Sequence, residues 1–178
     1  MKNKSNFKMP EVIDLGTLNQ STIYSLDTNI YRFRNVGGGS QLTDKAERYV
    51  CGYPIPEIQR RVVWDIDKQI KFIESAWKGL PLGTYTIHEI DLHHCGTPKR
   101  FSGWLIDGQQ RLTSIQNYFD DVFPIFGAYW SELEDNYKNK FTGIKFSVYR
   151  AELWDINLIK ELYEILSYGG INHDVSQY

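Results

Sequence analysis

The residues best suited to chemistry lie in the stretch 105–115, Leu-Ile-Asp-Gly-Gln-Gln-Arg-Leu-Thr-Ser-Ile. An apolar segment predicted as a strand runs into Asp107 and Gly108, and an amphipathic helix is expected to begin at once. Its apolar positions recur at i, i+3 and i+7, namely Leu112, Ile115 and Phe119. Polar residues therefore fill the first turn, where backbone N–H groups lack partners: Gln109, Gln110 and Arg111. A helix start with a permissive glycine and an arginine favours an anionic ligand, usually phosphate.

Asp107 can serve such a site in more than one way. As a helix cap it would make the segment an Asp-Gly turn and leave Arg111 solvated. If phosphate binds at the helix start, Asp107 is better suited to hold a Mg²⁺ ion or to orient the attacking oxygen. Gln109 and Gln110 cannot act as bases, but their amides can hold water, phosphate oxygens or a base edge. Thr113 can donate to phosphate, although capping or packing suits its position better.

A second polar block lies in the segment 53–63, which two prolines are expected to keep extended. In an extended chain, Glu57, Gln59 and Arg61 project from one face. Arg60 then faces the other side. An arginine on the ligand side would clamp phosphate oxygens, whereas a surface ion pair with Glu57 would contribute little. Glu57 is also a candidate general base or magnesium ligand.

Three blocks, in this order, resemble the signature of the ParB/sulfiredoxin-like family typified by the N-terminal domain of GmrSD-type modification-dependent restriction enzymes. The block 56–65 resembles the pattern P-x-x-Q-R-x-x-V-W and is followed by a helix and by Gly-Leu-Pro-Leu-Gly at 79–83. The block 106–113, Ile-Asp-Gly-Gln-Gln-Arg-Leu-Thr, resembles the central motif. The block 169–173, Gly-Gly-Ile-Asn-His, resembles a closing G-G-x-x-H variant associated with phage-borne members. Together these blocks define a motif-bearing core of about 53–174.

The resemblance implies an α+β, ParB/sulfiredoxin-like fold with a small mixed sheet packed against helices. It also implies a nucleoside triphosphate, ATP or GTP, as ligand, with Mg²⁺ held by Asp107. The expected catalytic residues are Asp107, Glu57 and Arg111. The expected nucleotide- and phosphate-binding residues are Gln59, Arg60, Gly108, Gln109, Gln110, Thr113 and His173. His173 follows two glycines and either closes over the nucleotide or belongs to a frayed terminus.

Modified DNA is a further candidate partner. The net charge of −2 predicts weak binding to unmodified duplex, because counterion release needs many Lys and Arg contacts. A target base would then have to be recognised directly, by stacking of an extruded base on Trp64 or Trp104, with Arg61 nearby. The alternative is that both tryptophans belong to the core.

These observations favour a phosphoryl-transfer enzyme that acts in a phage or bacterial DNA-modification or defence context. Its reaction is either hydrolysis of the triphosphate or kinase-type transfer, including transfer to a hydroxymethylated base in DNA. Two other classes remain open. One is a non-catalytic module that senses nucleotide or DNA, and the other is a ParB-like nuclease, which is less favoured because no full nuclease motif is present.

The composition predicts one folded domain over 1–178, since 42% of the 178 residues are hydrophobic and 15% are aromatic. Two cysteines form no disulfide framework, and the start of the chain lacks the apolar run of a signal peptide. No apolar stretch is long enough to span a membrane. A cytoplasmic protein is therefore expected, in the host cytoplasm if it is phage-encoded.

Periodicity gives the expected elements. Strands are predicted over 22–36, 84–91, 101–106 and 143–149. Helices are predicted over 41–50, from 66 to 77 behind the cap Asp65, from 109 to 119, and after the cap Asp155.

Overall fold

The computed structural model describes residues 12–36 and 43–168. Its helices are α1 (Ile23–Asn35), α2 (Ile66–Trp77), α3 (Gln109–Phe119), α4 (Asp135–Thr142) and α5 (Ile156–Tyr168), with a short 3₁₀ turn at Trp130–Glu132. Its strands are β1 (Thr17–Asn19), β2 (Arg48–Val50), β3 (Tyr53–Ile55), β4 (Thr84–His88), β5 (Leu105–Asp107) and β6 (Ser147–Ala151). The fold is α+β, as the sequence predicts.

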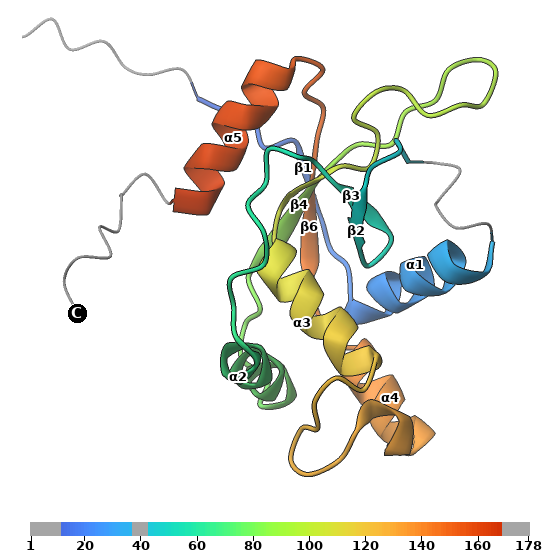
Figure 1. Cartoon of the computed structure of the whole chain (residues 1–178), viewed down its shortest axis with the longest axis vertical. Helices are drawn as coiled ribbons and strands as arrows, with labels where there is room; N and C mark the ends of the chain where they lie inside the picture. Colours follow the sequence, from blue (N-terminus) through green and yellow to red (C-terminus); the bar gives the residue numbers. More distant parts are fainter. Residues whose placement is uncertain (1–11, 37–42, 169–178) are drawn as a thin grey trace, which may run out of the picture.

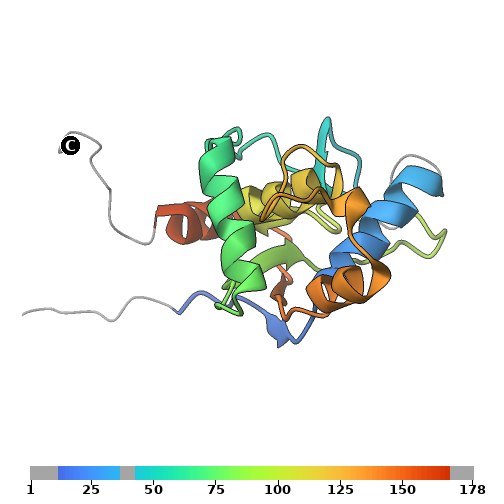
Figure 2. The same ribbon diagram turned by 90° about the horizontal axis from the view of Figure 1, so that it is seen from below.

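A mixed sheet of four strands, in the order β1-β6-β4-β5, forms the centre of the molecule. The β4 and β6 strands run parallel, while β1 and β5 pair antiparallel at the two edges. A separate hairpin joins β2 to β3. The α1 and α5 helices lie on opposite sides of the molecule in both views (Figures 1 and 2).

Two apolar clusters hold these elements together. The larger cluster joins α1, α2 and α3 to the sheet and the hairpin, and includes Leu26, Ile73, Tyr85 and Leu112. The smaller cluster packs α5 against the sheet through Ile106, Ile159 and other residues. Because α3 begins directly after the buried strand β5, the first turn of α3 has a fixed place at the edge of the sheet.

The predicted helices α2, α3 and α5 are confirmed. The Asp65 carboxylate accepts a hydrogen bond from the Lys68 amide at 2.8 Å and so caps α2. The Asp155 carboxylate accepts from the Asn157 amide at 2.8 Å at the start of α5. The strand predicted over 84–91 is confirmed in its first part as β4, which ends at His88.

Two predictions of secondary structure are wrong. The segment 22–36 is the helix α1, because its buried residues Ile23, Leu26 and Ile30 satisfy the helical period as well as an approximate alternation. The segment predicted as a helix over 41–50 ends in strand β2, whose turn into β3 places Cys51 and Gly52 at positive φ. Residues 41 and 42 lie outside the described residues.

Two strands are shorter at their start than predicted. The β5 strand begins only at Leu105, because Phe101 and Gly103 have φ of 72° and 70°. The β6 strand begins at Ser147 rather than at 143 and ends at Ala151. The helix α4 was not predicted, since its eight residues expose most of their side chains and bury only Phe141 and Thr142.

Among the described residues, no helix combines the length and the apolar character needed to cross a membrane.

Candidate functional site

A cavity of about 260 Å³ lies at the N-terminal end of α3. Three parts of the chain form it: the first turn of α3, the segment between β3 and α2, and the last turns of α5. The lining contains eight of the residues predicted from the sequence: Gln59, Arg60, Trp64, Asp107, Gly108, Gln109, Gln110 and Arg111. We call this cavity the α3 cavity and the segment 56–65 the strap.

Gly108 allows the chain to turn from β5 into α3. Its φ of 102° is in the left-handed region, and a Cβ at this position would lie 2.6 Å from the Cβ of Tyr85. No side chain caps the helix at this position. The N–H groups of the first turn therefore have no capping acceptor from the described residues and face the cavity end of the helix.

Asp107 and Arg111 form an ion pair at this helix start. The Arg111 Nη2 donates to Asp107 Oδ2 at 2.6 Å, and both side chains are 26% exposed. Of the two alternatives for Asp107, the one in which it caps the helix and leaves Arg111 solvated does not hold. A side chain at Gly83 would bring a Cβ within 3.2 Å of Arg111 Nη1, so this glycine leaves room for the guanidinium.

The strap is not a regular extended chain. The Gln59 amide donates to the Pro56 carbonyl at 3.0 Å, which closes a turn. Gln59 is then buried, and its Nε2 donates to the carbonyls of Leu105 and Ile106 in β5. The predicted alternation of faces is wrong because the turn places Gln59 and Arg60 on the same cavity, while Arg61 points elsewhere.

Gln110 and Tyr163 are among the side chains that hold the strap in place. The Gln110 Oε1 accepts from the amides of Val63 and Trp64, both at 3.0 Å. The Tyr163 hydroxyl of α5 accepts from the Arg60 amide at 3.1 Å. Gln110 thus positions the strap over α3, and it does so with the oxygen that could otherwise have bound a ligand.

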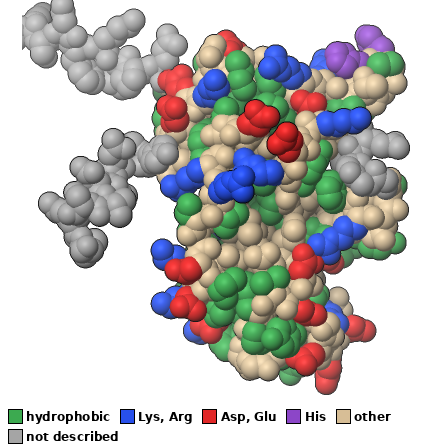
Figure 3. All heavy atoms as spheres, viewed as in Figure 1, with side chains coloured by type: hydrophobic (Ala, Val, Ile, Leu, Met, Phe, Trp, Pro, Cys, Tyr) green, Lys and Arg blue, Asp and Glu red, His purple; other side chains and the backbone are tan. Residues whose placement is uncertain are grey.

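The positively charged side chains in this part of the molecule also lie near the strap and the start of α3 (Figure 3). Lys and Arg side chains gather in the middle of the face that Figure 3 shows, over the strap and the start of α3. The α3 cavity itself is lined by Arg60 and Arg111 and by one carboxylate, Asp107. Its described lining therefore carries a formal charge of about +1 (two arginines less one aspartate), which suits an anion.

Several predicted residues lie outside the α3 cavity. Glu57 lines a neighbouring cavity together with Lys160 and Glu164, and Arg60 borders both. Arg61 and Thr113 line a third cavity beside the hairpin. Gln109 borders this third cavity as well as the α3 cavity.

The two tryptophans differ. Trp64 lines the α3 cavity and packs against Phe72, with ring centroids 5.8 Å apart. Trp104 packs edge-on against Phe101 at 4.7 Å, within the cluster beneath α5, and its indole Nε1 is buried. For Trp104, this packing favours the alternative that the ring belongs to the core. His173 lies outside the described residues.

Sequence reasoning missed the contribution of α5. Tyr163, Leu166 and Ser167 complete the lining of the α3 cavity. The helix itself was predicted, but nothing in its pattern indicated that its last turns reach a helix start more than fifty residues earlier in the chain. Gly83 belongs to the Gly-Leu-Pro-Leu-Gly block at 79–83. The position of Arg111 in the structure explains why this residue is a glycine.

The described lining of the α3 cavity offers one carboxylate as a ligand for Mg²⁺. This ion is commonly held in proteins by one or two carboxylates plus phosphate oxygens and water. Asp107 is the one carboxylate in the described lining of the α3 cavity. The described residues contain no group of three or more His, Cys, Asp and Glu that could hold a metal by themselves. The site therefore fits a magnesium ion that arrives with a polyphosphate.

Comparison with protein-family models matches residues 40–170 to the family described as the N-terminal domain of the GmrSD restriction endonuclease. The match covers well over half of the chain and confirms the resemblance drawn from the sequence blocks. No curated protein and no solved structure matches the chain.

Proposed function

Because the chain belongs to the family of the N-terminal domain of the GmrSD restriction endonuclease, we propose that its α3 cavity binds a nucleoside triphosphate and breaks the terminal phosphate bond. The family gives the context, which is restriction and modification of DNA. One observation carries the proposal: an uncapped helix start, two arginines and one carboxylate converge on a single cavity.

Binding follows from the charges. The first-turn N–H groups of α3 and the positive end of the helix dipole attract phosphate oxygens. Arg111 and Arg60 add charge-assisted hydrogen bonds from two directions. In the structure Arg111 pairs with Asp107, and a bound polyphosphate would compete for the guanidinium and leave the Asp107 carboxylate available.

Asp107 has two compatible roles in the reaction. It would hold Mg²⁺, which, when bound, neutralises charge on the phosphate oxygens. It would also orient the attacking oxygen. That oxygen, from water or from an alcohol acceptor, bonds to the γ-phosphorus, the bond to the β–γ bridging oxygen breaks, and the nucleoside diphosphate leaves. With an alcohol acceptor, a hydroxymethylated base in DNA for example, the product is a phosphate ester.

The test is release of labelled γ-phosphate from each of the four ribonucleoside triphosphates, with and without DNA that carries hydroxymethylated bases. Arg111→Ala should reduce turnover about a hundredfold or more, the usual effect of losing a transition-state charge contact. Arg34→Ala is the matched control, because Arg34 pairs with Asp120 at the other end of α3, and it should keep wild-type turnover.

The outcomes separate the candidate functions. Label found in inorganic phosphate supports hydrolysis, and label found in DNA supports a kinase. Cleavage of DNA without any consumption of nucleotide would contradict the proposal and favour a nuclease. Tight nucleotide binding without turnover under any of these conditions would favour a sensing module instead.

A further inference from the structure

A fourth cavity, of about 350 Å³, lies between α1, the β2–β3 hairpin and the sheet. None of its lining residues is shared with the α3 cavity. We call it the α1 cavity. Its volume falls within the range of sites for small ligands, roughly 300–1,000 Å³.

The polar face of α1 forms one wall of this cavity. Ile23, Leu26 and Ile30 are buried on the opposite face of the helix. The residues that line the cavity, among them Ser25, Thr28 and Arg32, recur at the spacing of one helical stripe. The wall is therefore rich in hydrogen-bonding groups and contains a cation.

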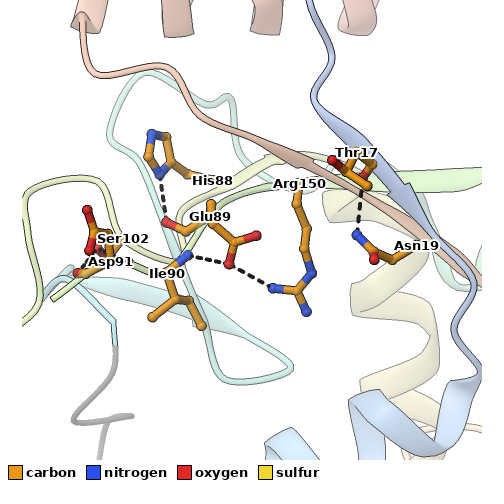
Figure 4. A network of polar contacts seen from close by, with 8 residues as sticks. All are labelled: Thr17, Asn19, His88, Glu89, Ile90, Asp91, Ser102 and Arg150. Carbon is orange, nitrogen blue, oxygen red and sulfur yellow. Dashed lines mark hydrogen bonds and ion pairs between the residues drawn. The ribbon is translucent and has the colours of Figure 1, made fainter.

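Arg150 of β6 faces this wall from the sheet, and its guanidinium is held by a positioned carboxylate. The Glu89 Oε1 accepts from the Ile90 amide at 2.9 Å and from Arg150 Nη1 at 3.2 Å (Figure 4). The Glu89 contact uses one of the five N–H donors of the guanidinium. Glu89 itself is not part of the described lining; its carboxylate fixes the orientation of the Arg150 guanidinium and offsets part of its charge.

The charged groups and the phenol that line the cavity can donate hydrogen bonds to a ligand. The described lining contains Arg32 and Arg150 and no carboxylate. Tyr53 of β3 adds a phenol, and burial raises the pKa of that hydroxyl, so it stays protonated at neutral pH. Tyr24, which is well exposed at the rim, offers an aromatic face.

From this arrangement we propose that the α1 cavity binds a phosphate ester, with the phosphate between Arg32 and Arg150. Two arginines from different elements, one of them oriented by a carboxylate, form a site suited to the anionic oxygens of a phosphate group. The ester comes either from a free mononucleotide or from the backbone of a nucleic-acid strand. The site is independent of the nucleotide proposed for the α3 cavity.

The experiment uses the full chain carrying Arg60→Ala and Arg111→Ala, so that phosphate binding at the α3 cavity is weakened. Titration calorimetry is then run with thymidine 5′-monophosphate, with a six-residue single-stranded oligothymidylate and with uncharged thymidine. Arg32→Ala and, separately, Arg150→Lys are added to this background. Arg34→Ala is the control, because Arg34 lies on the same helix, pairs with Asp120 and is not in the described lining.

We expect binding of the monophosphate or of the oligothymidylate and none of thymidine. Arg32→Ala and Arg150→Lys should each weaken that binding about tenfold, the loss of one charge-assisted contact, whereas Arg34→Ala should leave it unchanged. Tighter binding of the monophosphate identifies a free ester as the ligand. Tighter, strongly salt-dependent binding of the oligothymidylate identifies a strand. Absence of binding, or binding that neither variant weakens, overturns the proposal whatever the activity of the α3 cavity.

Discussion

An aspartate–arginine ion pair lies at each end of the α3 helix. The surroundings of the two pairs differ. At the N-terminus, Arg111 meets Asp107 at 2.6 Å, within one helical turn. At the C-terminus, Arg34 of α1 meets Asp120 at 2.7 Å across 86 positions of sequence. The two distances are nearly equal, so the geometry of an ion pair does not by itself distinguish a candidate site from a surface contact.

The surroundings make the distinction. The N-terminal pair lies beside uncapped N–H groups, a glycine at φ 102° and a cavity lined by a second arginine. Neither Arg34 nor Asp120 belongs to the described lining of any of the four cavities above. The side chains of Arg34 and Asp120 are 47% and 28% exposed. We conclude that the helix dipole and the cavity give Asp107 and Arg111 their proposed role.

The largest effect is expected from removing the charge of Asp107 at the N-terminal end of α3. The matched change at the other end is made at Asp120. Asp107→Asn keeps the size of the side chain but removes the charge that would hold Mg²⁺ or orient the attacking oxygen. Turnover of nucleoside triphosphate should fall about a hundredfold or more. Asp120→Asn should stay close to wild type, as followed by release of labelled phosphate. Equal losses in the two variants would contradict the distinction between the two ends.

A large effect on stability is expected at the glycine that begins α3. Gly108→Ala combines a left-handed φ with a Cβ contact of 2.6 Å to Tyr85, and should lower the free energy of unfolding by about 2–3 kcal/mol. Gly79→Ala, with φ of 77° and nothing within 4 Å of the added Cβ, should cost only about 1 kcal/mol. Urea unfolding of both variants measures the difference, and a Gly79→Ala variant as unstable as Gly108→Ala would remove the Tyr85 contact as the explanation.

A smaller, more selective effect is expected from the glutamines of α3. Gln110 accepts from two amides of the strap, whereas Gln116 accepts from the Cys51 amide of the hairpin turn at 2.6 Å. Replacement of either by alanine should cost about 1 kcal/mol of stability. Only Gln110→Ala should weaken nucleotide binding, by roughly tenfold if Arg60 loses its position. Calorimetry with a non-hydrolysable triphosphate provides the readout, and unchanged affinity in Gln110→Ala would show that the strap does not depend on this contact.

The smallest effect is expected at the C-terminal pair. Arg34→Gln removes an ion pair whose partners are both partly exposed to solvent, and should lower stability by less than about 1 kcal/mol. The difference from wild type should shrink further in 0.5 M salt, because screening weakens such pairs. Thermal unfolding at low and high salt measures it. A loss of several kcal/mol would show that this end of α3 is a structural anchor.

The helix start could be predicted because its parts are close in sequence. A buried strand, an Asp-Gly step and apolar residues at helical spacing fix the first turn, and residues four positions apart on a helix are neighbours. The same reasoning identified α2 through its cap Asp65. It failed for α1, because Ile23, Leu26 and Ile30 fit more than one periodicity and their burial against the sheet decides between them.

The amino-acid sequence by itself therefore determined the local pieces: the α+β class, the α3 start with Asp107 and Arg111, and the strap motif around Gln59 and Arg60. Only the tertiary structure decided which pieces meet. The turn at Pro56 brings Arg60 to the α3 cavity and turns Arg61 away, α5 closes the lining with Tyr163, and Glu89 orients Arg150. These contacts join residues tens of positions apart, and no local periodicity encodes them, because they depend on how buried strands and helix faces pack.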